Sequence, residues 1–484
     1  MKIMKRQIKG SLLIALLGII FLNSCSINDR FEKINIDENN PTSTPPEVLL
    51  SNVERHVFDD HGGFGDGFIG QFSQHFAGNH ATAVAYDQYD VTHSSFETFF
   101  TGSYINSLKD CDVIIKESKP GYEKYKGVAE ILTAYRLGYM TSLYGDIPYS
   151  EALDASILKP KYDKQIDIYT AIQGLLAKAI TDIDAGAVDL KGDFIYDGDT
   201  DKWKAAAYML SARYYNHLSK KDPAGSATSA LSAIDKAKAL GMDSSDWDLL
   251  IKFEGTAAYQ NPWDEMYGNG MVIANQPFID ELISTGDPRT EALFASIDRN
   301  GEEVYGVGKI QSGIPQVLNS TIMGGDDSYY GQKDSSLPAA SYAELLMIEA
   351  EAALRSGDKP RAAAAHNSAI IAHVNQVTSL PAGLARIDAY VATYASETSS
   401  SITLEKIMTA KHKITIAMSV ESWMDFRRLG NMYPTWSYIP LNDTETAPIG
   451  TQFIQRILYP QSELNSNGDN VPSATIFTKL PILE

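Results

Sequence analysis

Apolar residues at helical spacing are the feature that most constrains the fold of this chain. In QIDIYTAIQGLLAKAITDIDAG they recur at steps of three and four residues: Tyr169, Ile172, Leu176, Ile180 and Ile183. TDKWKAAAYMLSARYYNHLS repeats the pattern at Trp203, Ala207, Leu210, Tyr214 and His217. Either Thr200 or Asp201 can cap the start of this second segment. Stripes of this period are typical of amphipathic helices that bury one face, so we predict a mainly helical protein.

Small residues indicate how the helices pair. AELLMIEAEAALRSGDKPRAAAAHNSAIIAHVNQV has the pattern of two helices joined by the turn SGDKP. Its small residues have the spacing of a tetratricopeptide repeat of about 34 residues: Ala350, Gly357, Ala362 and Ala369. RLGYMTSLYG fits the same template through Leu137, Gly138 and Gly145. We therefore expect an all-α fold, an irregular tetratricopeptide-like helical-repeat scaffold.

Two regions lack the helical period. Residues 56–106 and 243–338 are rich in Gly, Asn, Asp and aromatic residues, as in EGTAAYQNPWDEMYGNG. Binding residues often lie on long loops that a rigid scaffold holds in place. We expect both regions to be loop-rich insertions that form the ligand face of a single helical domain, residues 49–484.

The first 24 residues predict a signal peptide. Four basic residues precede the apolar run LLIALLGIIFL, residues 12–22. A run of 11 residues is too short to span a bilayer, which takes about 20, but it suits a secretory signal. We therefore expect the protein to be exported.

Cys25 follows this segment in the sequence LNSC, which is similar to the lipobox of bacterial lipoproteins. We expect Cys25 to carry a lipid anchor, and the polar, proline-containing residues 25–48 to form a flexible tether. The second cysteine, Cys111, lies in a helical pattern and is expected to be a small buried residue.

The charge balance excludes some classes of partner. The chain has 41 Lys and Arg against 61 Asp and Glu, a net charge of −20. Four of the basic residues and none of the acidic ones lie in residues 1–24, so the remainder carries −24. Nucleic acids and anionic lipid headgroups require a positive surface, so neither is an expected partner. A neutral ligand is compatible with this charge.

The two insertions contain the residue types that bind sugars. Aromatic rings stack on the apolar faces of pyranose units, and amides or hydroxyls bond the ring hydroxyls. The candidate ligand-binding residues are Trp263, Tyr259, Asn261, Tyr267, Tyr329, Tyr330, Tyr86, Tyr89, His75 and Asn79. Trp263 and the pair Tyr329 and Tyr330 are preferred, because the neighbouring glycines and polar residues leave these rings little to pack against. Packing in a local core is the alternative role for every one of these rings.

No motif indicates a metal, a cofactor or a nucleophile. Asp197, Asp199 and Asp201 alternate as in a calcium loop, but later ligand positions fail, so helix capping is favoured. His75 and His80 are five residues apart and form no zinc motif. The nucleophile elbow, Walker and dinucleotide motifs are absent from the sequence.

The pair Arg427 and Arg428 could bind an anionic ligand. However, Asp425 lies three residues before Arg428, and this offset favours an ion pair on one short helix. We therefore expect a structural role for Arg428.

LYGDIPYSEAL, residues 143–153, contains two carboxylates that could act as the acid and base of a glycoside hydrolase. Gly145 and Pro148 instead favour a helix end and a chain reversal, in which Asp146 bonds backbone N–H groups. Glu151 has no enforced proximity to Asp146. Asp326 and Asp327 form an alternative acidic pair.

These segments together resemble the SusD/RagB family of outer-membrane nutrient-binding lipoproteins, in particular its SusD-like branch. The resemblance covers nearly the whole chain and rests on nine segments in family order. They include INIDENNPT, AYRLGYMTSLYGDIPYSEAL, YDGDTDKW, YAELLMIEAEA, ESWMDFRRLGNMYP and ILYPQSELNSN.

The resemblance implies a non-catalytic protein that is anchored by lipid in the outer membrane and faces the cell exterior. It implies a SusC-like TonB-dependent transporter as partner, for which the protein acts as a lid that captures oligosaccharides. A peptide ligand and, less favoured, a secreted helical glycoside hydrolase remain alternatives. The resemblance implies no cofactor.

Overall fold

A computed structural model describes most of the chain after the predicted tether. The described residues are 44–58, 60–256, 259–299, 302–306, 308, 320–325, 328–379, 386–430 and 453–484. The predicted signal peptide and Cys25 lie outside these ranges, as do Asp326 and Asp327. Among the helices within them, none combines the length and the apolar character needed to cross a membrane.

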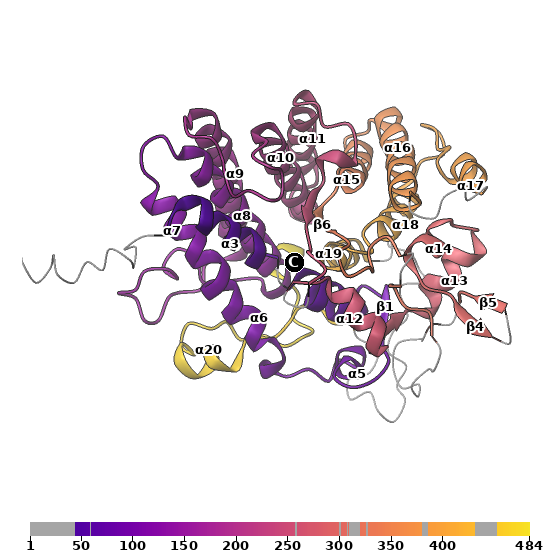
Figure 1. Cartoon of the computed structure of the whole chain (residues 1–484), viewed down its shortest axis with the longest axis horizontal. Helices are drawn as coiled ribbons and strands as arrows, with labels where there is room; N and C mark the ends of the chain where they lie inside the picture. Colours follow the sequence, from indigo (N-terminus) through magenta and orange to yellow (C-terminus); the bar gives the residue numbers. More distant parts are fainter. Residues whose placement is uncertain are drawn as a thin grey trace, which may run out of the picture.

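Three antiparallel helix pairs form a row along one side of the molecule (Figure 1). The pairs are α8 (Glu123–Tyr144) with α9 (Gln165–Ala185), α10 (Thr200–His217) with α11 (Pro223–Ala239), and α15 (Tyr342–Arg355) with α16 (Lys359–Val377). Helices α9 and α10 also contact each other, as do α11 and α15, so the pairs form a continuous layer. The predicted all-α helical-repeat scaffold is confirmed.

Further helices cover the ends of this row. Helices α3 (Pro46–His56) and α7 (Lys109–Glu117) pack on α8, and α17 (Ile387–Tyr394) and α18 (Leu404–Ile414) lie beside α16 at the other end (Figure 1). Helix α19 (Ser419–Leu429) lies nearer the middle of the molecule, where it contacts α8 and α10. Short helical turns are η4 (Leu218–Lys220), η5 (Ser245–Trp247) and η8 (Pro481–Leu483).

The local signals in the sequence account for the helix ends. Ser341 and Glu344 form a reciprocal capping box at the start of α15, and the Asp358 carboxylate caps α16. Helix α10 is capped by Asp199, which accepts hydrogen bonds from two backbone N–H groups, and not by Thr200 or Asp201 as expected. The small residues Ala350, Ala362 and Ala369 are fully buried where the helices meet.

Buried ion pairs join three helices, α15, α18 and α19. Arg428 of α19 donates to both oxygens of Glu351 of α15, at 2.5 and 2.7 Å, and to Asp425 at 2.8 Å. Lys411 of α18 contacts the other oxygen of Asp425 at 2.7 Å. Burial alone would raise the pKa of Glu351, but Arg428 holds that pKa well below its usual value. The predicted pairing of Asp425 with Arg428 is confirmed.

A second buried network lies next to it. Arg213 of α10 forms a bidentate pair with Glu344 of α15, at 2.7 and 2.5 Å. His217 and Glu421 are 2.7 Å apart and join α10 to α19. Breaking such a pair leaves a buried charge without compensation, so the networks fix one arrangement of these helices.

The first region expected to be a loop-rich insertion is largely helical. Residues 61–108 contain a π-helix η1 (His61–Ile69), α4 (Gly70–Phe72), α5 (Ala83–Asp87), η2 (His93–Phe96), α6 (Glu97–Gly102) and a second π-helix η3 (Ser103–Leu108). The glycines of η1 let the backbone pass close to its neighbours. A Cβ atom on Gly65 would lie 2.1 Å from the Tyr139 hydroxyl, and one on Gly67 would lie 2.5 Å from the Met266 sulfur.

The second region is built from short helices and strand pairs. Its helices are α12 (Pro262–Asn269), α13 (Gln276–Ser284) and α14 (Arg289–Leu293). Strand β1 (Phe76–Gly78) pairs antiparallel with β3 (Val272–Ala274), with Phe76 opposite Ala274, and so ties the two regions together. The other antiparallel pairs are β2 (Leu249–Ile251) with β6 (Leu337–Ala340), and β4 (Ile297–Arg299) with β5 (Glu302–Val304).

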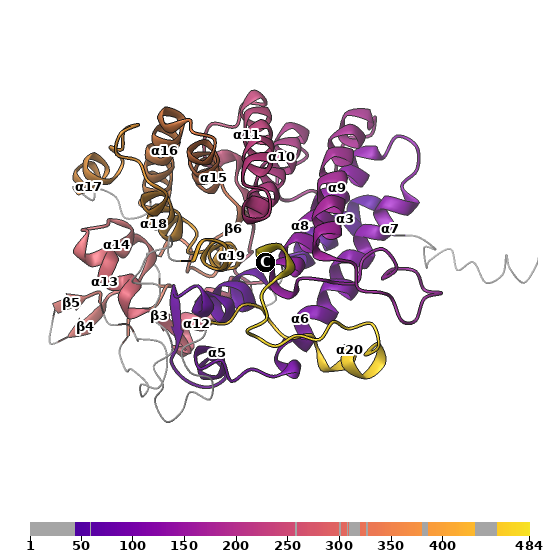
Figure 2. The same cartoon turned by 180° about the vertical axis from the view of Figure 1, so that it is seen from behind.

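The C-terminal segment closes the side opposite the helix row. It carries α20 (Gln461–Ser466) beside α6, and the segment crosses the lower half of the molecule in Figure 2. The Ser462 N–H donates to Glu97 of α6, and the Tyr459 hydroxyl donates to the Asp146 carbonyl at 2.8 Å. The end of the chain therefore holds the LYGDIPYSEAL turn in place.

Candidate functional site

The two irregular regions meet at the C-terminal end of α12. The backbone N–H of Asn79 donates to the Met271 carbonyl at 2.8 Å, and the His80 ring contacts the Asn269 carbonyl at 2.7 Å. Helix α12 and α5 both pack against η1. These contacts form a continuous surface, which we call the α12 surface: Asn79 to Thr82, Glu265 to Asn269, and Gly324 with Gly325.

Tyr267 is the exposed aromatic residue on the α12 surface. Its side chain is 41% exposed. Gly324, with φ of 149°, passes so close that an added Cβ would lie 2.5 Å from the Tyr267 Cβ. The glycine pair therefore supports the base of this side chain. It was not singled out from the sequence, although the doublet in MGGDD was a signal for a close approach.

Trp263, the preferred candidate, is fully buried in the structure. Its ring centroid lies 4.5 Å from that of Phe76. The expectation that Trp263 has little to pack against is therefore wrong, because residues 187 positions away in β1 supply its neighbour. Direct contact of Trp263 with a ligand remains a prediction that would require this core to open.

Asn261 and Tyr330 are also buried, and both hold the start of α12. The Asn261 carboxamide accepts from the Trp263 N–H at 2.9 Å and donates to the carbonyls of Tyr330 and Ser335, both at 2.8 Å. The Tyr330 hydroxyl lies 3.4 Å from the His373 ring nitrogen. These contacts position α12 against the segment that contains the Tyr329 and Tyr330 pair.

The four candidates from the first region are buried as well. The His75 ring stacks on His412 with centroids 4.0 Å apart, and burial lowers the pKa of His75 to about 3. The Asn79 amide donates to the Gly270 carbonyl. Tyr86 packs at a tilt against Phe68 and donates to the Ser95 carbonyl, and Tyr89 packs edge-on against Phe72. These side chains shape the α12 surface from beneath.

Tyr259 and Tyr329 remain partly exposed. The Arg55 guanidinium lies 4.1 Å from the centre of the Tyr259 ring and is paired with Glu254 at 2.8 Å. Tyr329 packs edge-on against Tyr330, with centroids 5.0 Å apart. Of the ten candidates, Tyr259, Tyr267 and Tyr329 therefore have side-chain surface that a ligand can reach in this conformation.

Burial shifts the pKa values of two ionisable groups beneath the α12 surface, Asp66 and His61, toward their uncharged forms. Burial raises the pKa of Asp66 well above its usual value, although the Ser419 N–H donates to it at 2.9 Å. Burial lowers the pKa of His61 to about 4. Its two ring nitrogens contact the Tyr135 hydroxyl and the Ala417 carbonyl, both at 2.9 Å. Burial therefore favours the uncharged form of both side chains beneath the surface.

The acidic pair considered as catalytic has a structural role. Helix α8 ends at Gly145, with φ of 82°, as the sequence predicts. The Asp146 carboxylate accepts from the Gln165 N–H at 2.8 Å and from the Lys164 ammonium at 2.9 Å. Glu151 accepts from the Lys161 N–H at 3.0 Å. Both carboxylates hold the loop between α8 and α9.

The other considered sites are occupied by protein contacts. Asp199 caps α10, which confirms capping as its role. Arg427 donates to the carbonyls of Ser142 and Gln455, and its guanidinium lies 3.7 Å from the Trp423 ring. The part of the chain that the structure describes contains no group of three or more His, Cys, Asp or Glu side chains able to hold a metal ion.

The α12 surface can bind a ligand by stacking and hydrogen bonding. It combines the exposed Tyr267 ring with the exposed polar residues Glu265 and Asn269. An aromatic face with a few polar groups beside it suits a molecule with one apolar and one polar face.

Comparisons with known proteins identify the family and the fold of the chain. Residues 38–460 match the model of the SusD-like family described as "Starch-binding associating with outer membrane". A solved structure described as a chitin-binding protein is 26% identical, with a TM-score of 0.75 over 88% of this chain and 95% of that one. A search of curated proteins found no significant match.

Two further solved structures share the fold. A chitin-binding SusD homolog from Flavobacterium johnsoniae is 21% identical, with a TM-score of 0.70 over 88% of this chain and 93% of that one. A SusD/RagB family protein from Bacteroides thetaiotaomicron is 20% identical, with a TM-score of 0.71 over 88% of this chain and 95% of that one.

Proposed function

Because this chain belongs to the SusD-like family, we propose that it captures oligosaccharides at the cell surface and delivers them to a SusC-like TonB-dependent transporter in the outer membrane. In this proposal it acts as the lid of the transporter and changes no bond. The lipid on Cys25 anchors it, and the residues between Cys25 and α3 give it reach; the tether expected over residues 25–48 is shorter, because Pro46–Val48 belong to α3.

The observation that carries the proposal is the exposed Tyr267 ring on the α12 surface. A pyranose unit stacks on this ring, while Glu265 and Asn269 bond its hydroxyl groups. Burial favours the uncharged forms of His61 and Asp66 beneath the surface, which suits a neutral ligand. The chitin-binding relative supports a sugar as the ligand, because it shares the fold over most of both chains.

A binding role is favoured over hydrolysis. The carboxylates of Asp146 and Glu151 are engaged with backbone N–H groups, whereas a glycoside hydrolase needs two carboxyls facing the scissile bond. A peptide ligand is the alternative that the same tyrosines could also accommodate.

Calorimetric titration with starch and chitin oligosaccharides tests the proposal. We expect Tyr267→Ala to weaken binding by about tenfold, because one stacking contact is lost, and Tyr267→Phe to retain it. Tyr208→Ala, which removes a partly exposed tyrosine on α10, is the matched control and should leave affinity unchanged. Binding of peptides but of no sugar would refute the proposal, as would release of new reducing ends.

Delivery needs a separate experiment. The protein should co-purify with a co-expressed SusC-like transporter in mild detergent, and Cys25→Ala should abolish lipid labelling of the protein. Normal oligosaccharide uptake by cells that carry only the Tyr267→Ala variant would contradict the role of the α12 surface in capture.

A further inference from the structure

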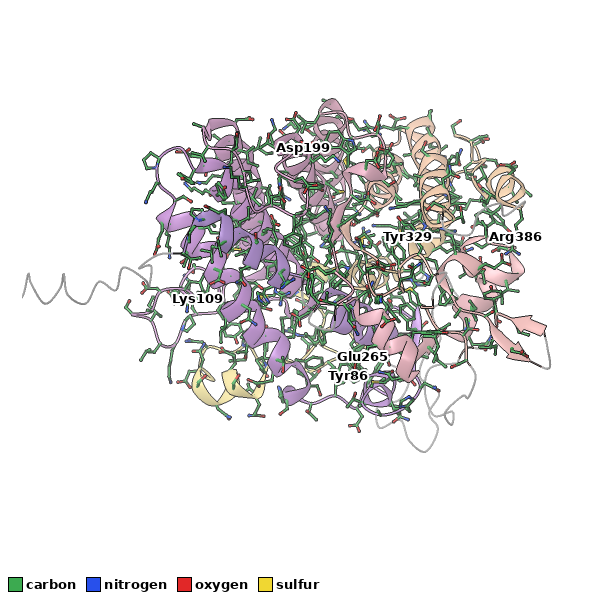
Figure 3. All side chains as sticks on the ribbon, viewed as in Figure 1. Tyr86, Lys109, Asp199, Glu265, Tyr329 and Arg386 are labelled. Carbon is green, nitrogen blue, oxygen red and sulfur yellow. The ribbon has the colours of Figure 1, made fainter. Side chains whose placement is uncertain are left out.

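A cavity of about 600 Å³ lies at the end of the helix row, between α13, α16, α17 and α18. No residue of the α12 surface lines it. In Figure 3, Arg386, which precedes α17, lies far to the side of Glu265 and Tyr86. Its volume is within the range of about 300–1,000 Å³ that is usual for small-molecule sites. The cavity is therefore a separate place where a ligand of a few rings can fit.

Two tyrosines in contact form one wall of the cavity. The rings of Tyr390 and Tyr394 on α17 are tilted by 34° to each other, with centroids 4.6 Å apart. Tyr390 is buried and locked, because its hydroxyl donates to Asp287 at 2.6 Å and accepts from Arg289 at 2.9 Å. Tyr394 is only partly buried, and the Lys413 ammonium lies 5.9 Å from the centre of its ring, so part of the ring surface is available to a ligand. The buried Tyr390 ring therefore holds the accessible Tyr394 ring in position.

The rest of the lining is apolar at the base and rich in hydroxyls at the rim. Ile370 of α16 and Ala410 of α18 are buried and supply apolar surface. Thr393, Thr403 and Thr409 supply hydroxyl oxygens. The Thr393 and Thr409 hydroxyls each donate to a backbone carbonyl of their own helix, which leaves their lone pairs to accept from a ligand. This is the pattern that a pyranose unit requires.

The charges in the lining discriminate between sugars. Lys406 pairs with Glu397 at 2.8 Å, and Lys413 pairs with Glu281 at 3.1 Å. The third carboxylate, Glu405, makes no ion pair within the described part of the chain, so the lining carries one uncompensated negative charge. An anionic sugar would be repelled, whereas a neutral or amino-substituted sugar would not.

We propose that this cavity is a second sugar-binding pocket, which takes one or two neutral or amino-substituted pyranose units and rejects uronic acids. The inference rests on the proposed function, since it assigns the pocket to the same class of ligand. An oligosaccharide held at Tyr394 and another at Tyr267 would give the protein two binding sites on different faces.

Titrations of the full mature chain with three probes test the pocket: an N-acetylglucosamine oligomer, a glucosamine oligomer and an oligogalacturonate. We expect two sites for the N-acetylglucosamine oligomer and no binding of oligogalacturonate to the Tyr267→Ala variant, which retains only the pocket. Tyr394→Ala should remove one site and leave the other, whereas Tyr394→Phe should retain both. Glu405→Gln should weaken binding of the glucosamine oligomer about two- to fivefold and leave the N-acetylated oligomer unaffected.

The outcomes separate the two proposals. If Tyr394→Ala, folded by its circular dichroism, keeps the full number of sites, the pocket is refuted while the α12 surface stands. Oligogalacturonate binding that Tyr394→Ala abolishes would refute the stated selectivity. If none of the three probes nor a starch oligosaccharide binds the unmodified chain, the proposed function itself fails. Thr409→Val, which keeps the volume of the side chain, provides a second variant and should weaken only the site that Tyr394→Ala removes.

Discussion

The row of paired helices and the glycine-rich segment η1 are both buried, but different interactions bury them. In the row, apolar stripes and small residues pack helix on helix, and pairs such as Arg428 with Glu351 fix the packing. In η1, glycines admit the side chains of Tyr139 and Met266, and His61 and Asp66 bond to the segment just before and at the start of α19. Scaffold stability therefore depends on paired charges, whereas the support of the α12 surface depends on close backbone approach.

Of the changes that test this difference between the two regions, breaking a buried ion pair should reduce the free energy of unfolding most. Glu351→Ala leaves the Arg428 guanidinium buried without its main acceptor, so we expect a loss of about 3–5 kcal/mol in the free energy of unfolding. Urea denaturation measures this loss. A change below about 1 kcal/mol would show that the scaffold does not depend on paired charges.

Adding a side-chain atom where the η1 backbone lies close to its neighbours should reduce the free energy of unfolding by a smaller amount. Gly65→Ala places a methyl group against the Tyr139 hydroxyl, and we expect a loss of about 1–3 kcal/mol. Gly174→Ala on the exposed face of α9 is the control, because no atom lies within 4 Å of the new Cβ. That control should gain up to about 1 kcal/mol through helix propensity. A stabilised Gly65→Ala variant would remove the distinction between the two regions.

The pH dependence of stability distinguishes the regions further. Because the pKa of His61 falls from 6.5 to about 4 on folding, its contribution is complete above pH 6.5 and is lost as the pH falls toward 4. This corresponds to about 1.4 kcal/mol for each pH unit in that interval. His61→Gln should reduce the slope of unfolding free energy against pH by this amount, measured by urea denaturation at several pH values. An unchanged slope would mean that folding does not lower the pKa of His61.

An exposed ion pair should have the smallest effect. Arg55 and Glu254 contact each other at 2.8 Å, but their side chains are 38% and 62% exposed. We expect Glu254→Ala to cost at most about 1 kcal/mol in thermal or urea unfolding, because solvent screens the pair. A loss as large as that of Glu351→Ala would show that burial does not govern the strength of these pairs.

The sequence predicts the helix row because its signals are local and periodic. Helices α9 and α10, the α15–α16 pair, the stop at Gly145 and the pairing of Asp425 with Arg428 all follow from residues close together in the chain. Burial of Trp263 and His75 does not follow in this way, since Phe76 and His412 lie 187 and 337 positions away from them. A segment rich in aromatic residues and glycines can form either an exposed loop or a buried core without a helical period, and its composition does not distinguish the two. The exposure of Tyr267 allows the predicted contact with a ligand, and that contact remains a prediction.

The link between η1 and α19 has a consequence for the order of events during synthesis. The Asp66 carboxylate bonds the Ser419 N–H across 353 positions, and the His61 ring bonds the Ala417 carbonyl across 356. These contacts cannot form until most of the chain has left the ribosome, whereas the α8–α9 pair needs only residues 123–185. We infer that the helix row begins to fold first and that the floor of the α12 surface is completed last. A truncated chain that ends before α19 would therefore keep paired helices without a formed capture surface.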